Sequence, residues 1–223
     1  MMTTSPETVA APRRELATRN ARWARAFAEQ LAASGVRPNA VSVAGVGFAL
    51  ASGTAFYLSP DFARGGRAAL LFAAAACIQL RLVCNLLDGM LAVEGGLKSR
   101  TGEIFNDLPD RVADVLILVG AGYAIREFAS GPTLGWAAAV VAVFTAYVRV
   151  LGGSLGLTQH FIGPMAKQHR MFTLTVASLL ASVEALVDMP PRAIPAGLAV
   201  IVAGSIATAV RRTRRILHEA GAR

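Results

Sequence analysis

Long apolar segments alternate with short polar ones over most of the chain. Residues 41–58, 68–87, 105–125, 133–152, 171–187 and 193–210 are mainly apolar over about the length of a membrane-spanning helix, roughly 20 residues. The first and last segments carry no charged residue, whereas each of the other four contains at least one. The pattern predicts an all-α integral membrane protein with six transmembrane helices, joined by short connections in one domain.

The segment before the first apolar run has a different pattern. Residues 1–12 are small and polar and are predicted to form a flexible tail. Residues 13–36 are predicted to form an amphipathic helix with Leu16, Trp23, Phe27 and Leu31 on one broad face. A basic helix with such a face is typical of the membrane interface. The alternative, a surface helix of a soluble domain, is disfavoured by the apolar segments that follow.

Composition and charge agree with a membrane protein and indicate its orientation. The chain is 54% hydrophobic and 16% charged, against about a quarter charged in soluble domains. The net charge is nevertheless +8. One side of the predicted bundle has only four basic residues, Arg64, Arg67, Arg126 and Arg192. Because basic loops stay in the cytoplasm, both termini are predicted to be cytoplasmic, with the membrane domain at 37–215 and a short tail at 216–223.

Ionisable residues inside predicted spans tend to mark function, and here they concentrate between the second and third spans. Asn85 and Asp88 share one helix face, and Asn106, Asp110 and Asp114 share a face of the next helix. A glycine-rich connection is expected to fold the two helices antiparallel. Carboxylate and amide oxygens without histidine or cysteine favour Mg²⁺ or Mn²⁺ over zinc. The sequence therefore predicts a hard-cation site at the cytoplasmic end.

The same segment resembles the signature of the CDP-alcohol phosphatidyltransferase family, D-x2-D-G-x2-A-R-x8-G-x3-D-x3-D. The register is kept without gaps by Asn85, Asp88, Gly89, Ala92, Val93, Gly102, Asn106 and Asp110. The resemblance implies a six-helix membrane domain preceded by an interfacial helix. It also implies a transferase that moves a phosphatidyl group from a CDP-linked lipid, such as CDP-diacylglycerol, to an alcohol acceptor and releases CMP.

Three signature positions differ from the family pattern. Carried over residue by residue, Asp88 is a metal ligand, and Asp110 is both a metal ligand and the candidate base. Asn85 and Asn106 stand where the family has aspartate and are neutral ligands through their carbonyl oxygens, and Val93 replaces the signature arginine. Losing two carboxylates is expected to weaken or abolish one metal site, so one or two Mg²⁺ or Mn²⁺ ions are implied. The nearby acids Glu94, Glu103 and Asp107 are candidates for compensation.

Several other positions resemble elements of the family that contact substrate. Asn39 and Ser42 resemble its P-N-x-x-[ST] element near the nucleotide, although Asn39 would also serve as a helix N-cap. Arg149 resembles an arginine that clamps phosphate, with snorkelling to the interface as the alternative. Lys167 and Arg170 resemble a basic phosphate-binding loop, or are a plain topology signal.

Two further arginines have alternative interpretations. Arg111 is either a phosphate partner or an ion-pair partner of Asp107 or Asp114. Arg81 is interpreted as a packing or lipid-headgroup residue. The substrate-binding set implied by the resemblance is Asn39, Ser42, Gly89, Ala92, Gly102, Arg111, Arg149, Lys167 and Arg170.

Three functions follow from these patterns. The first is a phosphatidyltransferase of phospholipid biosynthesis in a bacterial inner membrane, with membrane lipids and a homodimeric partner implied and no nucleic acid. The second is a catalytically impaired relative that binds nucleotide-lipid or a cation in a regulatory role, as Asn85 and Asn106 suggest. The third is an ion or proton transporter, which the location of the polar cluster at the cytoplasmic end disfavours.

Overall fold

The protein is described by a computed structural model covering residues 22–94 and 102–222, and these residues form helices and short connections without a strand. The predicted tail and residues 13–21 of the predicted interfacial helix lie outside these ranges. The helices are α1 (Arg22–Ala33), α2 (Pro38–Leu58), the 3-10 turn η2 (Ser59–Asp61), α3 (Arg64–Glu94), α4 (Gly102–Tyr123), α5 (Gly131–Ser154), α6 (Lys167–Leu186) and α7 (Ala193–Gly221).

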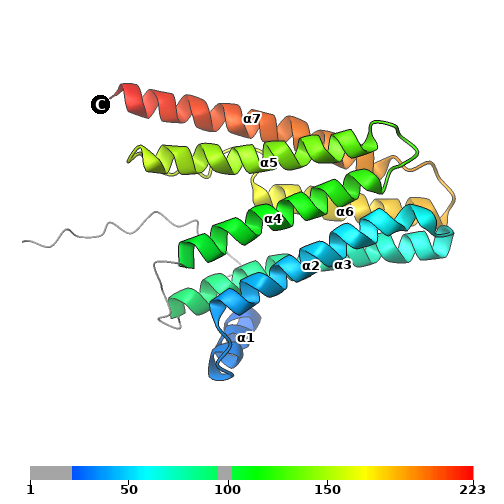
Figure 1. The fold of residues 1–223 in the computed structure, drawn as a ribbon, viewed down its shortest axis with the longest axis horizontal. Helices are drawn as coiled ribbons and strands as arrows, with labels where there is room; N and C mark the ends of the chain where they lie inside the picture. The colour runs from blue at the N-terminus through cyan, green and yellow to red at the C-terminus, as the bar shows by residue number, and fades with distance from the viewer. Residues whose placement is uncertain (1–21, 95–101, 223) are drawn as a thin grey trace, which may run out of the picture.

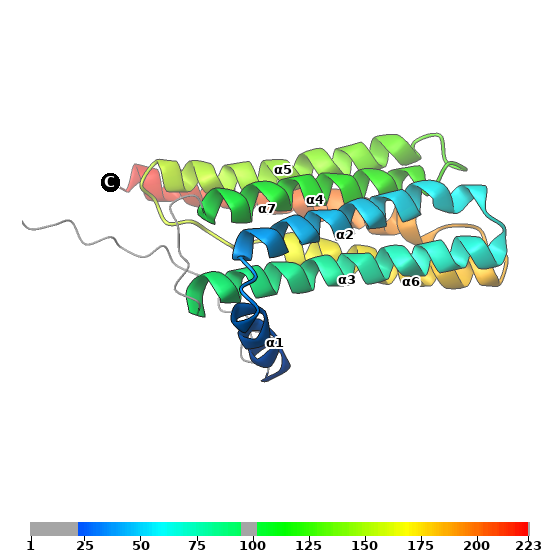
Figure 2. The same ribbon diagram turned by 60° about the horizontal axis from the view of Figure 1, so that its bottom comes forward.

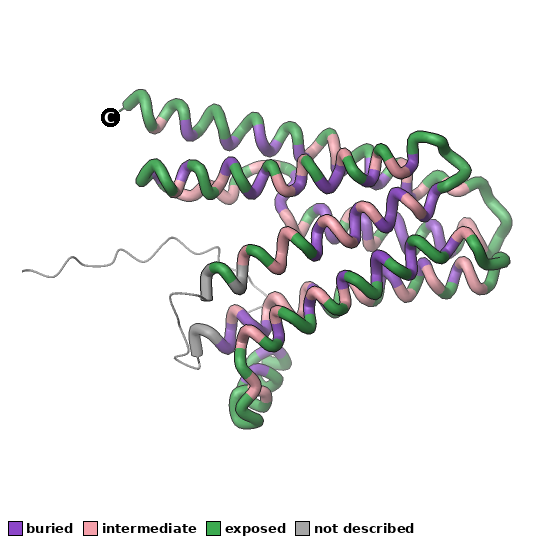
Figure 3. Tube along the Cα trace, viewed as in Figure 1, coloured by how far each residue is buried: buried purple, intermediate pink, exposed green. Residues whose placement is uncertain are grey.

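Six long helices pack side by side in a closed ring (Figures 1 and 2). Going round the ring, α2 packs against α3, α3 against α6, α6 against α7, α7 against α5, α5 against α4, and α4 against α2. Buried positions gather on the helix faces that meet other helices, and exposed positions lie on the outer faces (Figure 3). Many outer positions are large and apolar, as in Phe72, Val140 and Phe172, each at least 60% exposed. Such an apolar exterior is typical of a protein embedded in lipid.

Four helices are long and apolar enough to cross a membrane: Pro38–Asp61, Arg64–Leu91, Gly131–Ser154 and Ala193–Gly221. The predicted all-helical fold is therefore confirmed, with four candidate membrane spans in the part of the chain that the structure describes. The other two predicted spans, α4 and α6, complete the same ring but carry more charged residues, among them Asp110, Asp114 and Arg170. Two helices extend beyond the predicted spans. Helix α3 continues to Glu94, and α7 continues into the predicted tail as far as Gly221.

Helix α1 lies across the end of the bundle at a steep angle to α3 (Figure 2). Its contact face is made of small residues, since Ala24 and Ala28 are buried against Leu87 and Leu91 near the end of α3. The large apolar side chains of the helix point elsewhere: Trp23 is 54% exposed and Phe27 is 48% exposed.

Glycines let the backbones of neighbouring helices approach closely, as is common in membrane bundles. A Cβ atom on Gly53 of α2 would lie 2.5 Å from the carbonyl oxygen of Leu116 in α4, and one on Gly120 would lie 2.6 Å from Gly53. Gly122 of α4 and Gly135 of α5 approach each other in the same way. These contacts fix how closely α4 packs against both neighbours.

The variant Gly53→Ala is expected to destabilise the bundle by about 1–3 kcal/mol, because a backbone carbonyl cannot move aside as a flexible side chain can. The measurement is the thermal unfolding midpoint in detergent. Gly47→Ala is the matched control on the same helix, since its added Cβ meets no atom within 4 Å. Equal midpoints for the two variants would contradict the close approach of α2 and α4.

Candidate active site

Five helices bring polar side chains to one end of the ring. Because successive helices run in opposite directions, the first turns of α2, α4 and α6 share this end with the last turns of α3 and α5 (Figure 1). Ser42, Asp88, Asp110, Arg149 and Lys167 therefore meet although they are far apart in sequence. The two signature helices, α3 and α4, face each other as the sequence predicts.

Asp88 is buried, with 5% of its surface exposed. Its Oδ2 accepts a hydrogen bond of 2.6 Å from the hydroxyl of Ser42, which confirms that the two predicted elements meet. Its Oδ1 is also buried and has no hydrogen-bond partner among the described residues. A buried carboxylate oxygen without a partner is costly, so this atom fits a bound cation.

Asn85, Asp88 and Asp110 line one small cavity, together with Ser42 and Arg81. In the described part of the chain, no group of three or more acidic, histidine or cysteine side chains is placed to hold a metal ion. Ala92 lies in α3, and Gly102 and Asn106 lie in α4. The surroundings of these three residues are outside the described part of the structure.

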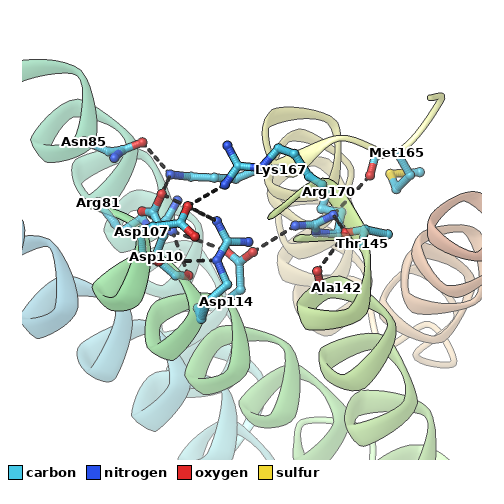
Figure 4. Close-up of polar contacts among 12 residues, drawn as sticks. Arg81, Asn85, Asp107, Asp110, Asp114, Ala142, Thr145, Met165, Lys167 and Arg170 are labelled. Carbon is cyan, nitrogen blue, oxygen red and sulfur yellow. Dashed lines mark hydrogen bonds and ion pairs between the residues drawn. The ribbon is translucent and has the colours of Figure 1, made fainter. Parts of the chain in front are cut away.

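The candidate base, Asp110, is held by two cations (Figure 4). The guanidinium of Arg81 donates to its Oδ1 at 3.0 Å and to its backbone carbonyl at 3.3 Å. The ammonium of Lys167 donates both to Asp110 Oδ2 and to Asn85 Oδ1. Lys167 thus connects α6 with α3 and α4 at the centre of the site.

Deeper inside the bundle, the carboxylate of Asp114 forms ion pairs with two buried arginines. It accepts from Arg81 at 3.2 Å and from Arg170 at 2.9 Å, and none of the three side chains is more than 2% exposed. Arg170 also donates to Thr145 and to the carbonyl of Met165. The guanidinium of Arg170, predicted to bind phosphate or to be a topology signal, is thus buried and bonded within the protein interior.

Two other predicted arginines lie at the rim and share one carboxylate. Asp107 accepts from Arg149 at 2.6 Å and from Arg111 at 3.2 Å. Of the two alternatives for Arg111, the structure thus shows the ion pair with Asp107. The guanidinium of Arg149 also lies over the ring of Phe161, 5.2 Å from its centroid. The Arg111 and Arg149 side chains are 18% and 17% exposed, so both remain accessible from the open end.

Two further predicted residues lie on helices that form the site. Asn39 and Gly89 are both half-buried, on α2 and α3. The alternative role of Asn39 as an N-cap is wrong, because α2 begins at Pro38 and its N-cap is Arg37.

Of the two interpretations of Arg81, packing and a lipid-headgroup contact, the structure favours packing. The Arg81 side chain is 2% exposed and bonded to Asp110 and Asp114, so it does not contact lipid headgroups. The signal was present, because a charged residue inside an apolar span usually has a buried partner. Arg81 lies one helical turn before Asn85, which places it on the same helix face.

Comparisons with known proteins agree with the signature. No family model matches the chain. The phosphatidylinositol phosphate synthase of Streptomyces avermitilis is 26% identical over 201 residues, which cover 86% of this chain and 77% of the relative.

Solved structures of the Mycobacterium tuberculosis phosphatidylinositol phosphate synthase have the same fold. The structure with CDP-DAG bound aligns with a TM-score of 0.74 at 20% identity, over 88% of this chain and 94% of the other. The complex with manganese and citrate aligns with a TM-score of 0.72 at 21% identity, over 87% and 88%. In sequence and in fold, the chain is thus similar to phosphatidylinositol phosphate synthases, in agreement with the resemblance of its signature.

Proposed function

We propose that the protein is a membrane transferase that moves a phosphatidyl group from a CDP-linked lipid such as CDP-diacylglycerol to an alcohol and releases CMP. The observation that carries this proposal is Asp88, buried beside Asn85 and Asp110 with one oxygen bonded to Ser42 and the other free of partners. A relative that shares the fold binds CDP-DAG, which supports the choice of donor.

The residues of the site divide the work of this reaction. Arg149 and Arg111 at the rim supply guanidinium groups for the oxygens of a pyrophosphate, since arginine binds phosphate bidentately. Asp110 is positioned by Arg81 to accept the proton of the attacking alcohol. Asp88 and Asp110, with Asn85, would hold an Mg²⁺ or Mn²⁺ ion, whose positive charge would stabilise the leaving CMP. A relative solved with manganese supports the choice of ion.

The alcohol acceptor is inferred from the sequence relative. That relative is a phosphatidylinositol phosphate synthase, so an inositol phosphate is the first acceptor to test. Lys167, beside Asp110 at the centre of the site, and the rim arginines would suit an acceptor that carries its own phosphate.

The membrane placement follows from charge and packing. All six ring helices would span a bacterial inner membrane, with the charged Asp114 of α4 and Arg170 of α6 buried inside the ring and both termini on the cytoplasmic side. The exposed Trp23 and Phe27 suit α1, within the segment 13–36, to the membrane interface. Residues 37–215 would form the membrane domain and 216–223 a cytoplasmic tail, into which α7 continues as far as Gly221. A homodimer is implied by the family resemblance alone.

The direct test uses detergent-purified protein, Mn²⁺ or Mg²⁺ and labelled CDP-diacylglycerol, with inositol phosphate, a polyol phosphate and serine as acceptors. We expect acceptor-dependent CMP release that Asp110→Asn reduces at least tenfold, since general-base catalysis contributes roughly 10²–10⁴. No release with any acceptor would contradict the proposal.

A second function is favoured by a specific contact. The carboxylate of Asp110 is already engaged by Arg81 and Lys167, and Asn85 carries no charge. A site of this kind could bind a nucleotide-lipid tightly without turning it over. Saturable binding of CDP-diacylglycerol without CMP release would identify this impaired, regulatory relative.

The variant Arg149→Gln is expected to raise the KM for CDP-diacylglycerol about 10–100-fold, because a hydrogen bond to a charged group contributes roughly 1.5–3 kcal/mol. Asp107 keeps its bond to Arg111 in this variant, so the fold should persist. Arg211→Gln on the exposed face of α7 is the control and should leave KM unchanged. An unchanged KM for Arg149→Gln would remove Arg149 from the donor site.

A further inference from the structure

The ammonium of Lys167 lies where oxygen donors of the two signature helices meet. It donates to Asn85 Oδ1 on α3 and to Asp110 Oδ2 on α4 (Figure 4). Both acceptors are signature positions, and both line the same cavity as Asp88. A positive charge that belongs to the chain therefore stands between two side chains that the resemblance assigns to metal binding.

The asparagine at position 85 fits this arrangement. An amide oxygen is a good acceptor for an ammonium but a weak ligand for a divalent ion, which favours carboxylates. One lone pair of Asn85 and one oxygen of Asp110 are committed to Lys167. By contrast, Oδ1 of Asp88 has no partner among the described residues.

The net charge of the described side chains also argues against a second divalent ion. Around the cavity and its rim, the five cations Arg81, Arg111, Arg149, Lys167 and Arg170 stand beside the four carboxylates Asp88, Asp107, Asp110 and Asp114. Two divalent ions would add four positive charges to a cluster that already has a positive excess. At these separations like charges repel by several kcal/mol, at an effective dielectric constant of about 20.

We propose that the Lys167 ammonium replaces one of the two divalent ions of the family's site, so that this chain binds a single Mg²⁺ or Mn²⁺ at Asp88. The proposal rests on the proposed metal-dependent function and specifies its electrostatics. Lys167 acts as a fixed monovalent cation that holds Asn85 and Asp110 together.

The test counts Mn²⁺ ions bound per chain in the detergent-purified protein, by equilibrium dialysis with Mn²⁺ as the only probe. We expect one ion for the wild type and one for Asn85→Asp/Asn106→Asp, because Lys167 still fills the position. We expect two ions when Lys167→Met is added to these two substitutions. Asp88→Ala should bind none, and Arg64→Met, an exposed basic residue at the other end of the ring, is the matched control.

Two results overturn the proposal: two ions in the wild type or in Asn85→Asp/Asn106→Asp, or a single ion in the triple variant with an unchanged thermal midpoint. If the triple variant does not fold, the ion counts of the wild type and of Asn85→Asp/Asn106→Asp still test the proposal. A second ion in either protein shows that Lys167 does not exclude it. The count uses neither donor nor acceptor. The ion count can therefore contradict the single-ion proposal while CMP release is observed, or support it while transferase activity is absent.

Discussion

Asp88→Asn is expected to reduce CMP release by about 10²–10³-fold, the cost of removing one preorganised group that stabilises transition-state charge. The substitution keeps the volume of the side chain and a partner for the Ser42 hydroxyl, so the fold should be retained. It removes the charge of the buried carboxylate oxygen that has no partner among the described residues, which is the atom best placed to hold a cation. Turnover and Mn²⁺ binding are measured on the same preparation.

The control for this variant is Asp61→Asn at the opposite end of the ring, where Asp61 is 51% exposed and paired with Arg126. A surface change of this kind costs less than about 0.5 kcal/mol, so turnover should stay within roughly twofold. Near-normal CMP release by Asp88→Asn would show that Asp88 holds no essential cation. That result would contradict the cation site at Asp88 while leaving the transferase activity itself standing.

Asp114→Leu is expected to lower the free energy of unfolding by about 3–5 kcal/mol, because it leaves two buried guanidinium groups without their counter-charge. Arg81 and Arg170 are each 2% exposed, so neither can recover its charge compensation from water. The readout is the thermal midpoint in detergent. Because Arg81 also positions Asp110, activity at low temperature should fall as well.

Asp107→Asn is the matched control, an acid of the same helix that is 39% exposed at the rim. Its loss should change stability by less than about 1 kcal/mol, as for other partly exposed ion pairs. The double variant Asp114→Leu/Arg170→Met should recover part of the loss, since it removes one of the two unpaired charges. A midpoint for Asp114→Leu no lower than that of Asp107→Asn would contradict the buried network.

The sequence was informative where local pattern and function coincide. The spacing of Asn85, Asp88 and Asp110 predicted that their side chains share facing surfaces of two helices, because helical periodicity fixes which positions lie on one face. The element Asn39–Ser42 was placed near them by resemblance, and Ser42 does contact Asp88. Neither inference needed knowledge of the packing.

The sequence left alternatives open where a charged side chain needed a partner from another helix. Arg81 was interpreted as a packing or headgroup residue and Arg170 as a phosphate ligand or a topology signal, because a long arginine side chain can reach water or fold inward. Their side chains fold inward because Asp114, fully buried on α4, lies between them. That choice depends on how α3, α4 and α6 pack, and no local pattern contains it.

The sequence by itself therefore determined an all-helical membrane protein, the basic end of the bundle and the signature residues of a phosphatidyltransferase-like site. Hydropathy, charge asymmetry and helical spacing are properties of single segments, and each can be read before folding. Only the tertiary structure decided which cation neutralises which carboxylate, and that Lys167 stands between Asn85 and Asp110. Ion pairing depends on distance and burial, and both exist only after the six helices have closed into a ring.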